Sequence, residues 1–113
     1  MARVTRRTTG QPETPELRRL RRQIDALDRR IVAILNERAE LARAAGRAKM
    51  RGGRHTIRDV EREREVLLRV TMANQGPLGQ ADLLALYRRL MTATRALEAR
   101  DRTRGDSDEG DEA

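Results

Sequence analysis

The chain has 113 residues, enough for one small domain, and it contains no cysteine, which excludes disulfides and thiolate metal sites. Charged residues make up 38% of the sequence and Tyr87 is the single aromatic residue, so any core must be built from aliphatic side chains. The net charge of +7 points to an anionic partner, either a nucleic acid or a small anion.

Neither end of the chain shows a periodic pattern of hydrophobic residues. Residues 1–15 combine Thr, Arg, Gly and Pro, and we expect a disordered basic arm there. The arm has no apolar run, which favours a cytoplasmic protein without a signal peptide or membrane span. Residues 103–113 are acidic and of low complexity, and we expect a disordered tail. The predicted helical domain therefore covers residues 16–102.

The stretch from Glu16 to about Arg51 is predicted to form one long helix. Its apolar residues recur in steps of three and four and share one helix face: Leu17, Leu20, Ile24, Leu27, Ile31, Ile34, Leu41, Ala45 and Ala48. Such a helix would be about 54 Å long, whereas a domain of about 100 residues has a radius of gyration of about 13 Å. We therefore expect a homodimer in which two long helices pack along their apolar faces.

Two shorter helices are predicted to follow. Gly52-Gly53 would end the first helix, and Asp59 would cap a second one from Val60 to about Asn74. A turn at Gly76-Pro77 leads into a third helix from about Ala81 to Arg100. Because the sequence shows no β pattern and no internal repeat, it predicts an all-α fold with three helices per chain, the first of them very long.

Polar residues interrupt these otherwise apolar helix faces. They are Arg21, Arg38, Lys49, Glu63, Thr94 and Glu98. One interpretation is internal ion pairing, of Arg38 with Glu63 and of Lys49 with Glu98. The other is a cavity that holds a small dianion with a hydroxyl group, because buried charges are costly without a partner. The sequence offers no obvious nucleophile, metal cluster or phosphate loop, so we expect chemistry by positioning and fixed electrostatics, without a cofactor or metal ion.

Four motifs stand out between about Leu17 and Glu98. They are Leu20-Arg21-x-x-Ile24-Asp25-x-Leu27-Asp28, Leu35-x-Glu37-Arg38-x-Glu40-Leu41-Ala42, Gly46-x-x-Lys49 and Arg58-Asp59-x-x-Arg62-Glu63. Together they resemble the all-helical (type II) class of chorismate mutases. The resemblance implies an intertwined homodimer and a Claisen rearrangement of chorismate to prephenate without a covalent intermediate. This reaction belongs to the Phe and Tyr branch of aromatic amino acid biosynthesis.

The resemblance also implies roles for individual side chains. Arg38 and Arg21 would bind the two substrate carboxylates, with Arg21 reaching into the site of the partner chain. Lys49 would donate a hydrogen bond to the ether oxygen, where negative charge develops. Glu63 would accept a hydrogen bond from the substrate hydroxyl.

Further positions come from the same resemblance. Asp59 and Arg62 border the site, and Thr94 stands near a carboxylate where the family often has Ser. The loop after Lys49 is one residue longer than in enteric relatives, which affects the placement of Asp59. Glu98 stands where those relatives have Gln, a second donor to the ether oxygen. Because a carboxyl donates only when protonated, we expect activity to fall as pH rises through the pKa of Glu98.

Alternative functions stay open from the sequence. An isochorismate-pyruvate lyase has the same fold and cations, but such relatives tend not to keep the carboxylate that Glu63 represents. A basic helical module could bind nucleic acid through arginines that we otherwise expect to face solvent: Arg18, Arg19, Arg22, Arg29, Arg30, Arg43 and Arg47. No stacking aromatics accompany them, which disfavours that alternative. Some short family members are activated by the first enzyme of the shikimate pathway, and such a regulatory complex stays open here.

Overall fold

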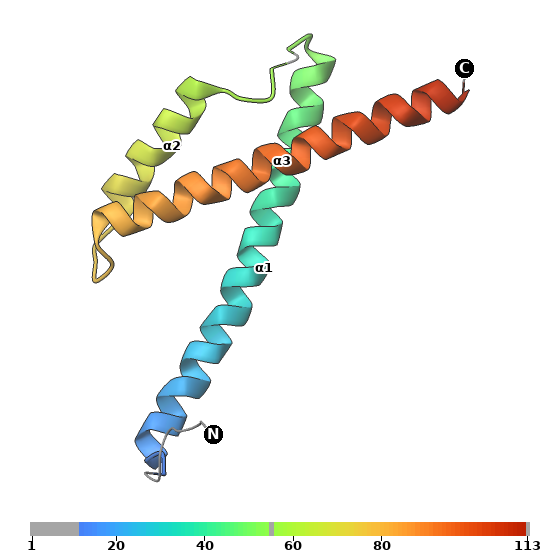
Figure 1. Cartoon of the computed structure of the whole chain (residues 1–113). Helices are drawn as coiled ribbons and strands as arrows, with labels where there is room; N and C mark the ends of the chain where they lie inside the picture. The colour runs from blue at the N-terminus through green and yellow to red at the C-terminus, as the bar shows by residue number, and fades with distance from the viewer. Residues whose placement is uncertain (1–11, 55, 113) are drawn as a thin grey trace, which may run out of the picture. The chain divides into compact units, whose positions relative to one another are not determined.

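The computed structural model describes residues 12–54 and 56–112, and it contains no strand within them. The described backbone forms three helices, α1 (Pro15–Arg51), α2 (Val60–Ala73) and α3 (Gln80–Glu112), as Figure 1 shows. The prediction of an all-α chain with three helices is therefore confirmed for this part of the sequence. The chain divides into two units, Met1–Glu37 and Arg38–Ala113.

Local signals set both ends of α1. The N–H of Leu17 donates to Oγ1 of Thr14 at 3.1 Å, so Thr14 caps the helix. Pro15 follows at the first helical position, where its missing N–H costs nothing. After the helix, Gly53 has a φ of 85°, a left-handed conformation that glycine adopts without strain. The predicted helix from Glu16 to Arg51 is confirmed, with its start one residue earlier.

In the first unit, the apolar face of α1 is exposed. Its exposed residues include Leu17, Leu20, Ile24, Leu27, Ile31 and Ile34, with exposed fractions between 38% and 59%. No described residue of α1 is buried. A continuous exposed apolar face of this length is typical of an interaction surface.

The second unit holds the only buried apolar side chain among those described, Met91 of α3. Helix α3 packs against α2, and long side chains join it to the C-terminal part of α1. There, Arg43 and Asp101 form two parallel hydrogen bonds, Nε to Oδ2 at 2.8 Å and Nη2 to Oδ1 at 2.9 Å. The expectation that Arg43 faces solvent is therefore wrong. Its partner Asp101 is 58 residues away in the sequence, so no local pattern indicates this contact.

The bounds of α2 follow the prediction, whereas those of α3 do not. Oδ1 of Asp59 accepts a hydrogen bond from the N–H of Arg62 at 3.0 Å, which confirms Asp59 as the N-cap. The third helix was expected to end at Arg100, but α3 continues to Glu112. No proline follows Arg100, and a glycine such as Gly105 costs a helix only about 1 kcal/mol.

The predicted domain limits stay predictions. The backbone of residues 103–112, expected to be a disordered tail, is helical in the structure. Most of the predicted basic arm, residues 1–11, lies outside the described residues. In the described part of the chain, no helix combines the length and the apolar character needed to cross a membrane.

Candidate active site

A cavity of about 340 Å³ lies in the second unit, with walls from α1, α2, α3 and the loop before α2. Seven of the predicted site residues line it: Arg38, Lys49, Asp59, Arg62, Glu63, Thr94 and Glu98. Its volume is in the range of small-ligand pockets. The eighth predicted site residue, Arg21, lies in the first unit. Its side chain there is 61% exposed and pairs with Glu13. The chain therefore brings together every predicted site residue except the one expected to act in a partner chain.

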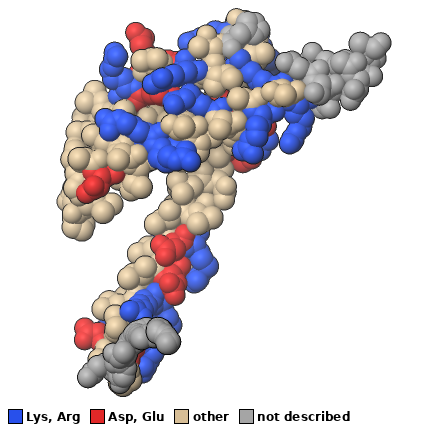
Figure 2. Space-filling view, viewed as in Figure 1, with Lys and Arg blue, Asp and Glu red and all other residues tan. Residues whose placement is uncertain are grey.

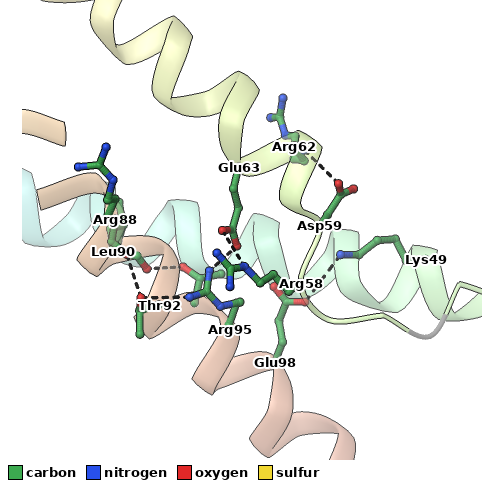
Figure 3. A network of polar contacts seen from close by, with 11 residues as sticks. Lys49, Arg58, Asp59, Arg62, Glu63, Arg88, Leu90, Thr92, Arg95 and Glu98 are labelled. Atoms are coloured by element: carbon green, nitrogen blue, oxygen red, sulfur yellow. Dashed lines mark hydrogen bonds and ion pairs between the residues drawn. The ribbon is translucent and has the colours of Figure 1, made fainter. Parts of the chain in front are cut away.

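Lys49 and Glu98 point toward one another from α1 and α3, as Figure 3 shows. Nζ of Lys49 lies 4.0 Å from Oε2 of Glu98, and only 12% of the Glu98 side chain is exposed. Burial raises the pKa of Glu98 above its usual value, and the Lys49 charge partly opposes this shift. Among the described residues, Oε2 of Glu98 has no hydrogen-bond partner. This carboxyl is thus placed to hydrogen-bond a ligand, as a donor when it is protonated.

Space for the Glu98 carboxyl depends on a glycine in α1. A Cβ atom on Gly46 would lie 3.1 Å from Oε2 of Glu98, closer than ordinary van der Waals contact. The Gly46-x-x-Lys49 motif therefore places a small residue opposite the carboxyl, one helical turn before the lysine.

Glu63 is held from two sides. Nη1 of Arg95 donates to its Oε2, and Nε of Arg58 lies 3.5 Å from its Oε1 (Figure 3). Of the two internal ion pairs considered from the sequence, that of Lys49 with Glu98 is present. Among the described residues, the ion pairs of Glu63 are with Arg58 and Arg95 rather than with Arg38.

Arg38 lies against the single aromatic ring of the chain. Its guanidinium carbon is 5.9 Å from the ring centroid of Tyr87, within the range of a cation–π interaction. A cation–π contact is not a hydrogen bond, so the N–H groups of Arg38 can still bind a carboxylate. Tyr87 thereby contributes to the placement of a cation at the cavity wall.

The remaining predicted site residues carry additional local contacts. The hydrogen bond from the backbone N–H of Arg62 lowers the pKa of Asp59, so this carboxyl stays ionised near neutral pH. The Arg62 side chain is 59% exposed and pairs with Glu65. Oγ1 of Thr94 donates to the carbonyl of Leu90 at 2.9 Å within α3. Its oxygen can therefore accept a further hydrogen bond, and it can donate one only after the hydroxyl rotates.

Sequence reasoning missed Arg95, which lines the cavity and is only 26% exposed. The signal for it was present, because Met91, Arg95 and Glu98 follow one another at steps of four and three in α3. With Arg95 included, the cavity has four cationic side chains, Arg38, Lys49, Arg62 and Arg95, and three carboxyl groups, Asp59, Glu63 and Glu98. This combination suits a polyanionic ligand that also carries polar groups.

The visible surface of the second unit is mixed in charge (Figure 2). Figure 2 shows basic side chains over much of the visible face of the second unit, with acidic side chains among them. Within the described residues, no group of three or more His, Cys, Asp and Glu side chains is arranged to hold a metal ion.

Comparison with known proteins gives consistent matches. Residues 20–99 match the sequence model of the family described as "Chorismate mutase type II". The bifunctional chorismate mutase/prephenate dehydratase of Aquifex aeolicus is 37% identical over 87 residues, which cover 74% of this chain and 24% of that protein. The enzyme of the same name from Stutzerimonas stutzeri is 36% identical over 90 residues, covering 76% and 25%. The chain thus spans about a quarter of the length of these relatives.

A solved structure agrees with the sequence matches. The chorismate mutase (form II) from Thermus thermophilus superposes with a TM-score of 0.69 and 31% identity, covering 75% of this chain and 96% of that chain. The resemblance and the all-helical fold predicted from the sequence are both confirmed. Because the family match extends over more than half of its residues, this chain belongs to the chorismate mutase type II family.

Proposed function

We propose that this chain is a chorismate mutase that rearranges chorismate to prephenate. The observation that carries the proposal is one cavity that gathers Arg38, Lys49, Glu63 and Glu98. In this reaction an ether C–O bond breaks as a C–C bond forms, and negative charge builds on the ether oxygen. Cations, a hydrogen-bond donor and an acceptor are the groups that a dianion with a hydroxyl and an ether oxygen requires.

Lys49 and Glu98 would act on the ether oxygen. Their facing atoms are 4.0 Å apart, so one oxygen atom of a ligand can contact both. The ammonium group donates directly, and Glu98 donates while it is protonated. Because both groups are fixed before the reaction, they stabilise the developing charge without reorganisation. Removal of one such donor typically lowers kcat by about 10²- to 10³-fold.

Arg38 would bind one substrate carboxylate, and Arg21 of a partner chain would bind the other. Two features support a homodimer with shared sites. The apolar face of α1 is exposed along the first unit, and Arg21 lies on that same helix with an exposed side chain. Packing of a second copy along α1 would cover the apolar face and carry a guanidinium to the partner's site.

Glu63 would accept the hydrogen bond from the substrate hydroxyl. Its carboxylate has two oxygens with about four acceptor positions, so its ion pairs leave capacity for the substrate. Asp59 and Arg62 would border the ligand at the start of α2, and Thr94 would contact a substrate carboxylate after rotation of its hydroxyl.

The competing functions have less support. Glu63 lines the cavity, and this carboxylate favours the mutase over an isochorismate-pyruvate lyase. For nucleic acid, one of the expected surface arginines, Arg43, is instead engaged with Asp101. A reaction on a dianionic metabolite of aromatic amino acid biosynthesis fits a cytoplasmic enzyme. A regulatory complex with the first enzyme of the shikimate pathway stays an open alternative.

The test uses the purified full chain. We expect conversion of chorismate to prephenate, no release of pyruvate from isochorismate, and the mass of a dimer in solution. Absence of chorismate turnover, or pyruvate release alone, would contradict the proposal. Salt-sensitive DNA binding without turnover would favour the nucleic-acid alternative.

A further inference from the structure

We propose that Arg95 is a positioning residue, which holds the carboxylate of Glu63 in the orientation that accepts the substrate hydroxyl. The inference rests on the proposed mutase function and adds a residue that the sequence motifs do not include. Arg95 lies on α3 and Glu63 on α2, so their ion pair joins two walls of the cavity.

The ion pair of Arg95 with Glu63 is more shielded from solvent than the ion pair of Arg58 with Glu63. The exposed fractions of the two side chains are 26% and 18%, whereas that of Arg58 is 61%. Nε of Arg58 is also 3.5 Å from Glu63, at the edge of hydrogen-bonding distance. Exposed ion pairs are weak, because water and salt screen them. Arg95 is therefore the main constraint on the orientation of Glu63.

Arg95 is itself fixed by the helix that carries it. Its Nη2 donates to Oγ1 of Thr92 at 3.2 Å, and Oγ1 of Thr92 donates to the carbonyl of Arg88 at 3.0 Å (Figure 3). A chain of hydrogen bonds thus runs from the α3 backbone through Thr92 and Arg95 to Glu63. Groups held in this way keep their geometry during a reaction, and a misplacement of about 1 Å can cost about 100-fold in rate.

The hydrogen bonds of Arg95 orient its guanidinium group toward Glu63. Two of its five N–H donors are engaged, one on Nη1 with Glu63 and one on Nη2 with Thr92. On Glu63, Oε2 takes the Arg95 bond, while Oε1 has only the longer contact with Arg58. Oε1 is consequently the oxygen with more capacity to accept the substrate hydroxyl.

A double-mutant cycle tests this role with chorismate as substrate. We expect Arg95→Met to lower kcat by roughly 10- to 100-fold with little change in KM. In a Glu63→Ala background the same substitution should change kcat by less than about 3-fold, because its effect passes through the missing carboxylate. The matched control is Arg89→Met, which removes the same charge from an exposed position of α3 outside this hydrogen-bond chain and should leave kcat unchanged.

Two further variants distinguish the positioning role of Arg95 from a folding defect caused by Arg95→Met. Arg95→Lys keeps the positive charge, and Thr92→Val keeps both members of the ion pair. Each should lower kcat by a smaller factor, and each effect should disappear in the Glu63→Ala background. Equal losses with and without Glu63, or full turnover in folded Arg95 variants, would overturn the positioning role alone. A wild-type protein without chorismate turnover would overturn both the mutase function and the positioning role.

Discussion

Nζ of Lys49 lies 4.0 Å from Oε2 of Glu98, so a basic group of α1 and a largely shielded carboxyl of α3 face one another in the cavity. Burial raises the pKa of this carboxyl while the lysine lowers it, and burial has the larger effect. The pair therefore offers two donors to one ligand oxygen, provided that Glu98 is protonated.

Replacement of Lys49 should abolish most of the catalytic rate. We expect Lys49→Ala to lower kcat for chorismate by about 10²- to 10³-fold, because the charge that develops on the ether oxygen loses its cation. The matched control is Arg47→Ala, which removes a positive charge from an exposed position of the same helix. Steady-state kinetics should show that the control is unaffected. A Lys49→Ala enzyme with normal turnover would contradict the role given to this lysine.

The pH profile should depend on Glu98. Because its raised pKa keeps the carboxyl protonated at lower pH, wild-type kcat should fall as pH rises through that pKa. Glu98→Gln places an amide donor there, and its profile should be flat over the same range. Measurements of kcat from about pH 5 to 8 compare the two enzymes. A flat wild-type profile, or identical profiles, would refute the donor role.

The raised pKa of Glu98 also makes the stability of the protein depend on pH. A carboxyl with a raised pKa in the folded state contributes most to stability at low pH, and the contribution is lost as pH rises through the folded pKa. Glu98→Gln should therefore melt at a higher temperature than wild type on the alkaline side of that pKa. Scanning calorimetry across pH measures the difference, and a melting temperature that the substitution leaves unchanged at high pH would disagree.

Replacement of Gly46 by alanine should raise the stability of the protein and lower its activity. Gly46→Ala favours the helix by about 0.5–1 kcal/mol, but its Cβ would displace the Glu98 carboxyl and should lower kcat by roughly 10-fold. Gly105→Ala is the matched control, because it lies in α3 with open space around it. The control should gain stability and keep its activity. Full activity of Gly46→Ala would show that the placement of Glu98 is unimportant.

The ion pair between Arg43 and Asp101 should stabilise the second unit. The hydrogen bonds from Arg43 lower the pKa of Asp101, so the stabilisation is present above the pKa of an unfolded Asp and lost as pH falls through the folded pKa. Asp101→Asn should lower the melting temperature at neutral pH more than at acidic pH. Glu40→Gln removes the exposed partner of the same arginine and should have little effect. Equal shifts from both substitutions would contradict this assignment.

Local signals made the helix ends predictable. Pro15 and Gly53 bound α1, and Asp59 caps α2, because each acts on its own backbone neighbours. The length of α3 was not predictable from such signals. After Arg100 the sequence has no proline to stop the helix, and its acidic composition indicated only a tail.

Side-chain pairing across helices was harder to predict. The spacing of the polar residues and the family resemblance led to Lys49 and Glu98, which do lie together. The partner of Arg43 is 58 residues away, and no local pattern connects them. The pairing of Arg95 with Glu63 was not predictable either, because the two residues are 32 positions apart and lie on different helices.

We propose that two copies of the chain build each site together, and the activity of a mixture of two inactive variants tests this shared site. Arg21→Ala and Lys49→Ala would each be inactive alone, whereas a dimer with one chain of each kind has one intact site. Co-refolding of equal amounts should therefore restore about a quarter of the wild-type chorismate turnover. No recovery in a mixture shown to contain mixed dimers, or full activity of Arg21→Ala alone, would contradict the shared site.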